Sequence, residues 1–220
     1  MACLIYKGIL PKPDYSIMTM CGYDYQHTIN YLNTVTIPKL SEVGVNIETI
    51  KVADNNPFAP NGMTRLPAFT YKDGKPTKLR TLCNGSWKVE PALKWMRNKG
   101  IKRAINWIGI NTDEYPRRKR KSIRKWLQYQ YPLAEDINNN PSPKLNREGC
   151  IKLIQSVGWQ IPHKSACIIC PNKTVKDWYK LKYLYQDEWK RTIKIEKKIH
   201  KINPNMFLHR SRVPLEQAPI

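Results

Sequence analysis

The sequence predicts an α/β fold: a mostly parallel sheet with flanking helices, followed by a C-terminal helical segment. Strand-like and helix-like patterns alternate through the first half of the chain. The continuous apolar run at 104–110 is typical of a central parallel strand buried on both faces. An α/β domain is expected over residues 1–172, and a basic helical segment with an extended tail packed on it over residues 173–220.

Two helices and two strands are expected in the first part of the chain. Glycine commonly ends a helix, and Gly8 and Gly44 stand where two helical patterns stop. Alternation of apolar and polar residues indicates strands. The expected elements are a helix end at 1–10, a strand at 15–20, a helix at 28–43 with Pro38 starting or kinking its second part, and a strand at 45–53.

Further elements follow from the same signals. Asp73-Gly74 is a hairpin-type turn after a strand-like stretch, and Gly100 stops a helical pattern. The expected elements are a strand at 66–71, a helix at 87–97, a strand at 104–110, a helix at 145–157, a helix or helix pair at 174–201 and an extended arm at 203–220.

The charge balance points to a polyanionic partner. The 220 residues carry a net charge of +21, from 38 Lys and Arg against 17 acidic residues. Such an excess favours nucleic acid, nucleotides or an acidic protein, although a solvated lysine-rich surface has the same composition. The hydrophobic share of 41% indicates a globular protein. No apolar run reaches the length of a membrane span and no secretory signal opens the chain, so a reducing, cytoplasmic location is expected.

The cysteines of the second half suggest a metal site. Cys167 and Cys170 have C-x-x-C spacing, and Cys83 and Cys150 come from distant segments. Four thiolates suit a tetrahedral zinc or a cubane iron–sulfur cluster. A redox dithiol or inert core thiols are the alternatives. Cys3 and Cys21 lie far upstream and are expected to be unrelated to this set.

Polar and basic residues after the strand at 104–110 are further site candidates. Asp113 and Glu114 come near its carboxyl end, where open α/β sheets place their ligands. Residues 117–125 then hold seven basic side chains, with Trp126, Tyr129 and Tyr131 close behind. Basic charge with interleaved aromatics can hold phosphates and stack bases, or can be a solvated helix face. The nucleic-acid-binding candidates are Arg118, Lys119, Arg120, Lys121, Arg124 and Lys125.

A series of motifs covers most of residues 13–215. They are Pro13-Asp14-Tyr15-Ser16-Ile17, Gly22-Tyr23-Asp24, Leu66-Pro67-Ala68-Phe69-Thr70, Arg80-Thr81-Leu82-Cys83, Trp87-Lys88-Val89-Glu90-Pro91, Trp107-Ile108-Gly109-Ile110 with Asp113-Glu114 and Arg117, Tyr131-Pro132-Leu133, Arg147-Glu148-Gly149-Cys150, Pro162 to Cys167, Cys170-Pro171, Trp178, and His209-Arg210-Ser211-Arg212 with Pro214-Leu215. Taken in order, these motifs resemble phosphoadenosine phosphosulfate reductase-like proteins of the PP-loop, or adenine nucleotide alpha hydrolase, superfamily, and most closely the phage and mobile-element branch.

The resemblance implies that Cys83, Cys150, Cys167 and Cys170 bind a 4Fe–4S cluster, with zinc as the alternative. One departure is large, because the family's Gly-rich phosphate-binding loop after the first strand has no counterpart here. The fold is therefore expected to be an incomplete version of the family's, and adenine nucleotide is a doubtful ligand. Three explanations are open: a reading frame that starts upstream, a strand and loop from another chain, or loss of nucleotide chemistry.

Two functions follow from this resemblance. The first is an iron–sulfur protein associated with nucleic acid or a nucleoprotein assembly, whose nucleotide site is lost or incomplete. The alternative is an active enzyme, a sulfonucleotide reductase or an ATP-dependent nucleic-acid sulfur transferase, whose N-terminal loop is missing from this chain. In that enzyme the candidate catalytic residues are Asp113 and Glu114, and the candidate substrate- or nucleotide-binding residues are Arg80, Lys88 and Arg117.

Overall fold

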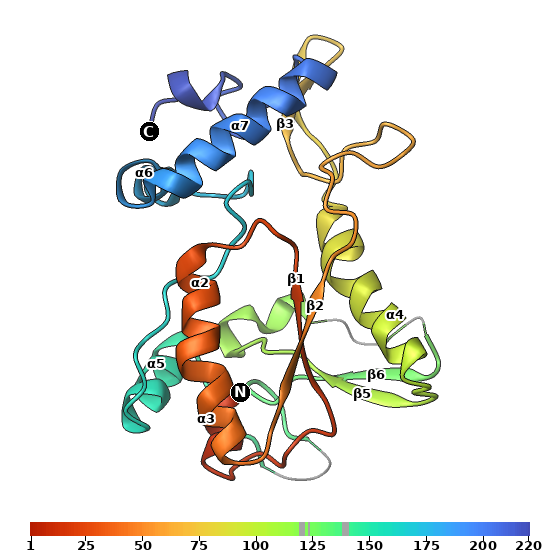
Figure 1. Ribbon diagram of the computed structural model, residues 1–220, viewed down its shortest axis with the longest axis vertical. Helices are drawn as coiled ribbons and strands as arrows, with labels where there is room; N and C mark the ends of the chain where they lie inside the picture. The colour runs from red at the N-terminus through yellow and green to blue at the C-terminus, as the bar shows by residue number, and fades with distance from the viewer. Residues whose placement is uncertain (119–121, 123, 138–140) are drawn as a thin grey trace. The chain divides into compact units, whose positions relative to one another are not determined.

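The computed structural model describes residues 1–118, 122, 124–137 and 141–220. These residues form an α/β structure of short helices, small two-stranded sheets and longer helices towards the C-terminus (Figure 1). The expected α/β class is confirmed. The chain divides into two compact units: unit 1 comprises Met1–Ile17, Asn30–Glu48 and Lys94–His163, and unit 2 comprises Met18–Ile29, Thr49–Leu93 and Lys164–Ile220. The expected division at residues 172/173 falls inside unit 2.

The N-terminal helices follow the expected pattern. Helix α1 (Ala2–Tyr6) ends before Gly8, whose φ of +70° is the left-handed conformation that glycine adopts without strain. Helix α2 (Gln26–Tyr31) continues through the π-helical turn η1 (Leu32–Thr36) into α3 (Ile37–Glu42). Pro38 stands in the first turn of α3, where its missing N–H removes a helical hydrogen bond, which agrees with the wider turn before it.

Two strand pairs form the first and last sheets along the chain. Strand β1 (Ser16–Met20) pairs with β2 (Ile47–Lys51), and β5 (Ala104–Trp107) pairs in parallel with β6 (Leu127–Gln130), as Figure 1 shows. The sequence did not indicate β6. The expectation that the run at 104–110 is a central strand buried on both faces is wrong: within the described residues β5 pairs along one edge only, and Ile105 is 50% exposed.

The core of unit 1 lies around α1 and α3. Its buried side chains come from both helices and from the loop after β6, and partly buried residues of α5 (Arg147–Ser156) pack against it. The short 3-10 helix η3 (Thr112–Arg117) precedes that loop. The buried core residues are Leu4, Ile5, Leu10, Leu40, Val45, Leu133 and Ile137.

Unit 2 contains a β-hairpin and the C-terminal helices. Strands β3 (Phe69–Lys72) and β4 (Lys75–Lys78) pair antiparallel through Asp73 and Gly74, both with positive φ, as a two-residue hairpin turn requires. The π-helical turn η2 (Gly85–Val89) leads into α4 (Glu90–Asn98). Helices α6 (Val175–Leu184) and α7 (Gln186–Ile202) follow one another, and η4 (Leu215–Gln217) is a 3-10 turn in the tail.

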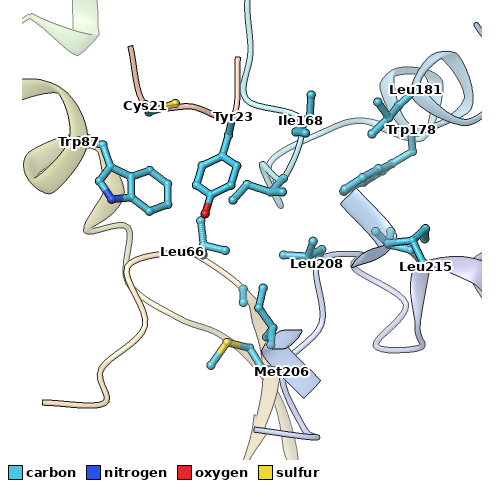
Figure 2. Packing of buried hydrophobic residues seen from close by; sticks show 14 of the residues in the cluster. Cys21, Tyr23, Leu66, Trp87, Ile168, Trp178, Leu181, Met206, Leu208 and Leu215 are labelled. Atoms are coloured by element: carbon cyan, nitrogen blue, oxygen red, sulfur yellow. The ribbon is translucent and has the colours of Figure 1, made fainter. Parts of the chain in front are cut away.

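The C-terminal tail is part of the core of unit 2. Met206, Leu208 and Leu215 are buried with Trp178 of α6, and Figure 2 shows these side chains together with Tyr23, Leu66 and Trp87. Helix α7 anchors the tail through Glu196, a buried carboxylate that accepts hydrogen bonds from the backbone N–H groups of Leu208 (3.2 Å) and Leu215 (2.7 Å).

No helix within the described residues is long and apolar enough to cross a lipid bilayer.

Candidate metal centre

The first half of the site is a tight turn directly after β1. Gly22 has a φ of +80°, which favours glycine, and a Cβ there would displace the Asn55 amide nitrogen, which would lie 2.6 Å away. The turn folds the Asp24 carboxylate back onto Cys21. Its Oδ2 accepts the Cys21 backbone N–H at 3.1 Å and lies 3.4 Å from the Cys21 sulfur.

The second half is the C-x-x-C turn, which pairs with the first through the backbone. Asp24 and Cys167 form an antiparallel β-bridge, and the Ile168 N–H donates to the Tyr23 carbonyl at 2.7 Å. This pairing places the Cys21 and Cys167 sulfur atoms 3.5 Å apart. Among the described residues, Cys21, Asp24 and Cys167 form a group whose potential ligand atoms all lie within 4.8 Å of one another.

The two sulfur atoms share one hydrogen bond, which shifts their pKa values in opposite directions. The hydrogen bond with Cys21 lowers the pKa of Cys167 against the effect of burial. The same hydrogen bond, and then burial, raises the pKa of Cys21. Cys167 therefore loses its proton more readily than Cys21, and thiolate is the form that binds metals.

Basic side chains supply positive charge to the turn. Lys173 is only 5% exposed, and its ammonium group donates to the Cys167 carbonyl and lies 5.2 Å from the Tyr25 ring. Burial lowers the pKa of Lys173 to about 8, although the negative charges of Cys170 and Cys167 act to raise it. The charge of Lys88 adds to the hydrogen bond with Cys21 in lowering the pKa of Cys167. At Cys83 the charge of Lys88 opposes burial, which raises the pKa of that thiol overall.

Cys83 and Cys170 also belong to unit 2. Cys83 packs against the core of unit 2, and its N–H donates to the Arg65 carbonyl at 2.7 Å. Burial and then the negative charge of Cys170 raise the pKa of Cys83. Cys170 closes the C-x-x-C turn by donating its N–H to the Cys167 carbonyl at 3.2 Å. Unit 2 therefore contains Cys21, Cys83, Cys167 and Cys170. Cys83 and Cys170 are not part of the group of ligand atoms within 4.8 Å, which consists of Cys21, Asp24 and Cys167.

Cys150 has different neighbours. It lies on α5 in unit 1 and lines a cavity of about 160 Å³ together with Cys3, Met1 and Trp159. Burial raises the pKa values of both Cys150 and Cys3. Its place among the ligands of the Cys167 turn stays a prediction. The expectation that Cys21 is unrelated to the cysteine set is wrong.

The other predicted site residues are divided between the units. Arg80 and Lys88 are exposed in unit 2. Asp113, Glu114 and Arg117 lie on η3 in unit 1. Asp113 accepts the Arg147 N–H at 2.9 Å, at the start of α5, and Glu114 forms an ion pair with Arg117. Asp113 is therefore a hydrogen-bond acceptor at the start of α5, and Glu114 and Arg117 form an ion pair at the surface.

The predicted nucleic-acid-binding run is described in part. Arg118 stacks on Tyr115, with its guanidinium carbon 3.7 Å from the ring centroid, and Lys125 is exposed. Arg124 is half-buried. Lys119, Arg120 and Lys121 lie outside the described residues.

A second basic and aromatic surface was missed. Tyr179 and Tyr183, about half exposed on α6, have ring centroids 4.5 Å apart. Lys176 and Lys180 are exposed on the same helix, and the Lys182 ammonium lies 5.4 Å from the Tyr183 centroid. We call Lys176, Tyr179, Lys180, Lys182 and Tyr183 the α6 face. Spacings of three, four and seven residues, which place side chains on one face of a helix, are the sequence signal for such a surface.

Comparisons with protein-family models, with curated proteins and with solved structures find no match to this chain.

Proposed function

We propose that this protein is a thiolate–metal protein that binds nucleic acid, in which the metal holds the C-x-x-C turn to the core of unit 2. The observation that carries the proposal is the 3.5 Å separation of the Cys21 and Cys167 sulfur atoms, with an Asp24 oxygen beside them. In this proposal Cys83 and Cys170, which belong to the same unit, supply two further thiolates and make a set of four soft donors. Such a set suits zinc or an iron–sulfur cluster and does not suit magnesium or calcium, which prefer oxygen.

The distance between the two sulfur atoms and the family resemblance favour different metals at this site. The family resemblance implies a 4Fe–4S cluster, in which each thiolate binds its own iron. Two thiolates of one tetrahedral zinc, at Zn–S distances of about 2.3 Å, lie about 3.8 Å apart. The separation of 3.5 Å is close to this value, which supports zinc as the alternative. A structural role fits either occupant, because the ligand segments come from three separate parts of unit 2.

The α6 face and the described part of the basic run support nucleic-acid binding. Exposed lysines can follow a phosphate backbone, while exposed tyrosine rings can stack on bases of a single strand. The net charge of +21 gives the long-range attraction. We therefore propose that the protein is part of a nucleoprotein assembly.

Metal analysis of the anaerobically purified protein tests the metal centre. A brown protein with about four irons per chain and broad visible absorbance supports the cluster. About one zinc per chain and no visible absorbance supports the mononuclear site. A metal-free protein that is as stable as the metal-loaded one contradicts the proposal.

Titration with ATP and with a single-stranded oligonucleotide separates the binding module from the enzyme alternative. We expect the oligonucleotide to bind with an affinity that falls steeply as salt is raised. Tight, saturable ATP binding would instead support the PP-loop enzyme, with Asp113, Glu114, Arg80, Lys88 and Arg117 as the first residues to substitute.

A further inference from the structure

Unit 1 contains a large cavity lined by strands of both of its sheets. Its volume is about 1060 Å³, at the upper end of the range of small-molecule pockets. One wall is the segment 11–17, which includes the start of β1, and another is β5. Met1, Ile5 of α1, and Trp95 and Met96 of α4 add an apolar lining.

Strand β5 lines this cavity along its whole length, together with Trp126 and Gln128 at β6. The Ala104 N–H donates to the carbonyl of Trp126, which precedes β6, and the Ile108 N–H donates to the carbonyl of Gln130, the last residue of β6, both at 2.9 Å. In a strand, successive residues direct their N–H and C=O groups to opposite edges. Ile105 and Trp107 therefore direct theirs away from β6, and both line the cavity.

The free edge of β1 lines the same cavity. The Met20 carbonyl accepts the Val52 N–H at 3.0 Å, so even-numbered residues of β1 face β2. Ile17 faces the opposite edge by the same alternation and is a lining residue. Within the described part of the chain, β1 and β5 each pair with one strand only. The cavity thus has hydrogen-bonding strand edges on two of its walls.

We propose that this cavity binds an extended segment of a partner protein, which pairs as a β-strand with the free edge of β5 and next to that of β1. Open strand edges are sites where peptides add by backbone hydrogen bonding. The apolar lining calls for apolar side chains in the middle of the segment. The segment also carries acidic side chains, because three of the four charged residues that line the cavity are basic: Lys12, Arg103 and Lys125, against Asp14.

A fluorescein-labelled peptide, Asp-Glu-Val-Thr-Ile-Thr-Val-Glu-Asp, is the probe. We expect saturable binding to the full chain, measured by fluorescence anisotropy. The control is the same peptide with N-methyl groups on alternate residues, which keeps the side chains and charges and removes one row of N–H donors. We expect its binding to be about tenfold weaker or worse. Equal binding of the two peptides, or no saturable binding of the first, overturns the proposal.

A matched pair of protein variants tests the edge itself. Ile105→Pro removes an N–H that does not face β6, and proline is tolerated on a free strand edge. Ile105→Val keeps that N–H. We expect the proline variant to lose peptide binding and the valine variant to keep it, with circular dichroism reporting that both are folded. Equal binding by both variants overturns the proposal.

Amide hydrogen exchange of the wild-type chain gives a readout that does not depend on variants. Peptide binding should slow exchange at Ile105 and Trp107, while Ala104 is already bonded to the segment beside β6. Unchanged exchange at both amides in the presence of saturating peptide contradicts strand pairing. The wild-type chain could instead self-associate without binding the peptide, and Ile105→Pro could abolish that self-association. This result would mean that the edge pairs with a second copy of the chain, and it would also overturn the proposal.

Discussion

The sulfur atoms of Cys21 and Cys167 lie 3.5 Å apart, although 146 residues separate them in the sequence. They meet because the turn after β1 and the C-x-x-C turn pair through the Asp24–Cys167 bridge. A pair of thiols at this distance, beside a carboxylate, is a ligand arrangement that local sequence spacing alone does not reveal. Substitution of either cysteine tests directly whether its thiolate is a metal ligand.

Substitution of Cys21 should remove the metal. We expect Cys21→Ser and Cys167→Ser to lose most of their bound metal and to unfold at a lower temperature, because metal binding contributes free energy to folding. Cys3→Ser is the matched control, since Cys3 is also buried but lies in unit 1. Metal content by mass spectrometry and thermal melts are the measurements. Full metal content in Cys21→Ser would remove Cys21 from the ligand set.

Cys150→Ser separates two possible ligand sets. If Cys21, Cys83, Cys167 and Cys170 bind the metal, this variant should keep its metal. If the set implied by the family resemblance holds, Cys150→Ser should lose metal as fully as Cys167→Ser does. The same metal analysis, performed on both variants side by side, decides between the two sets.

The α6 face should contribute to oligonucleotide binding. We expect Tyr179→Ala and Tyr183→Ala each to weaken binding of a single-stranded oligonucleotide by about tenfold, from the loss of base stacking. Lys180→Ala should reduce the slope of log affinity against log salt by about 0.7. Tyr15→Ala and Lys94→Ala, at exposed positions of unit 1, are the controls. Equal losses in the control and α6 variants would mean that charge or folding, and not this surface, governs binding.

Glu196 should be a large contributor to the stability of unit 2. Glu196→Ala leaves the buried N–H groups of Leu208 and Leu215 without their acceptor, and we expect it to lower the free energy of unfolding by about 3 kcal/mol. Glu216→Ala is the control, because that exposed side chain pairs with Lys197 at 3.0 Å and should contribute less than about 1 kcal/mol. Urea denaturation measures both. A similar small effect for both variants would mean that the tail is held by apolar packing alone.

The features that local sequence determines were predicted well. Gly8, Gly44 and Gly100 mark helix ends and have positive φ, and Asp73-Gly74 forms the hairpin turn. Short-range steric and hydrogen-bonding preferences are sufficient for such features.

The features that depend on distant pairing were not predicted. Cys21 reaches its partners only through the bridge to Cys167, and β6 exists only as the partner of β5. Glu196 lies within a lysine-rich amphipathic pattern, and only the packed tail explains its burial. One signal for Cys21 was present, since it directly precedes Gly22-Tyr23-Asp24, one of the segments on which the family resemblance rests.

His209 should make the stability of the protein fall as the pH falls. Its side chain is 2% exposed, and its Nδ1 accepts the Ser211 N–H at 3.2 Å, which favours the neutral ring. Burial, and then the charge of Arg210, lower the pKa of His209 from 6.5. The unfolded chain therefore binds this proton more readily, so stability is present above pH 6.5 and is lost as the pH drops below it. Urea denaturation at pH values above and below this point should show the loss, and His209→Gln should reduce it, whereas the exposed His163→Gln should not. An unchanged pH dependence in His209→Gln would mean that other groups cause the loss.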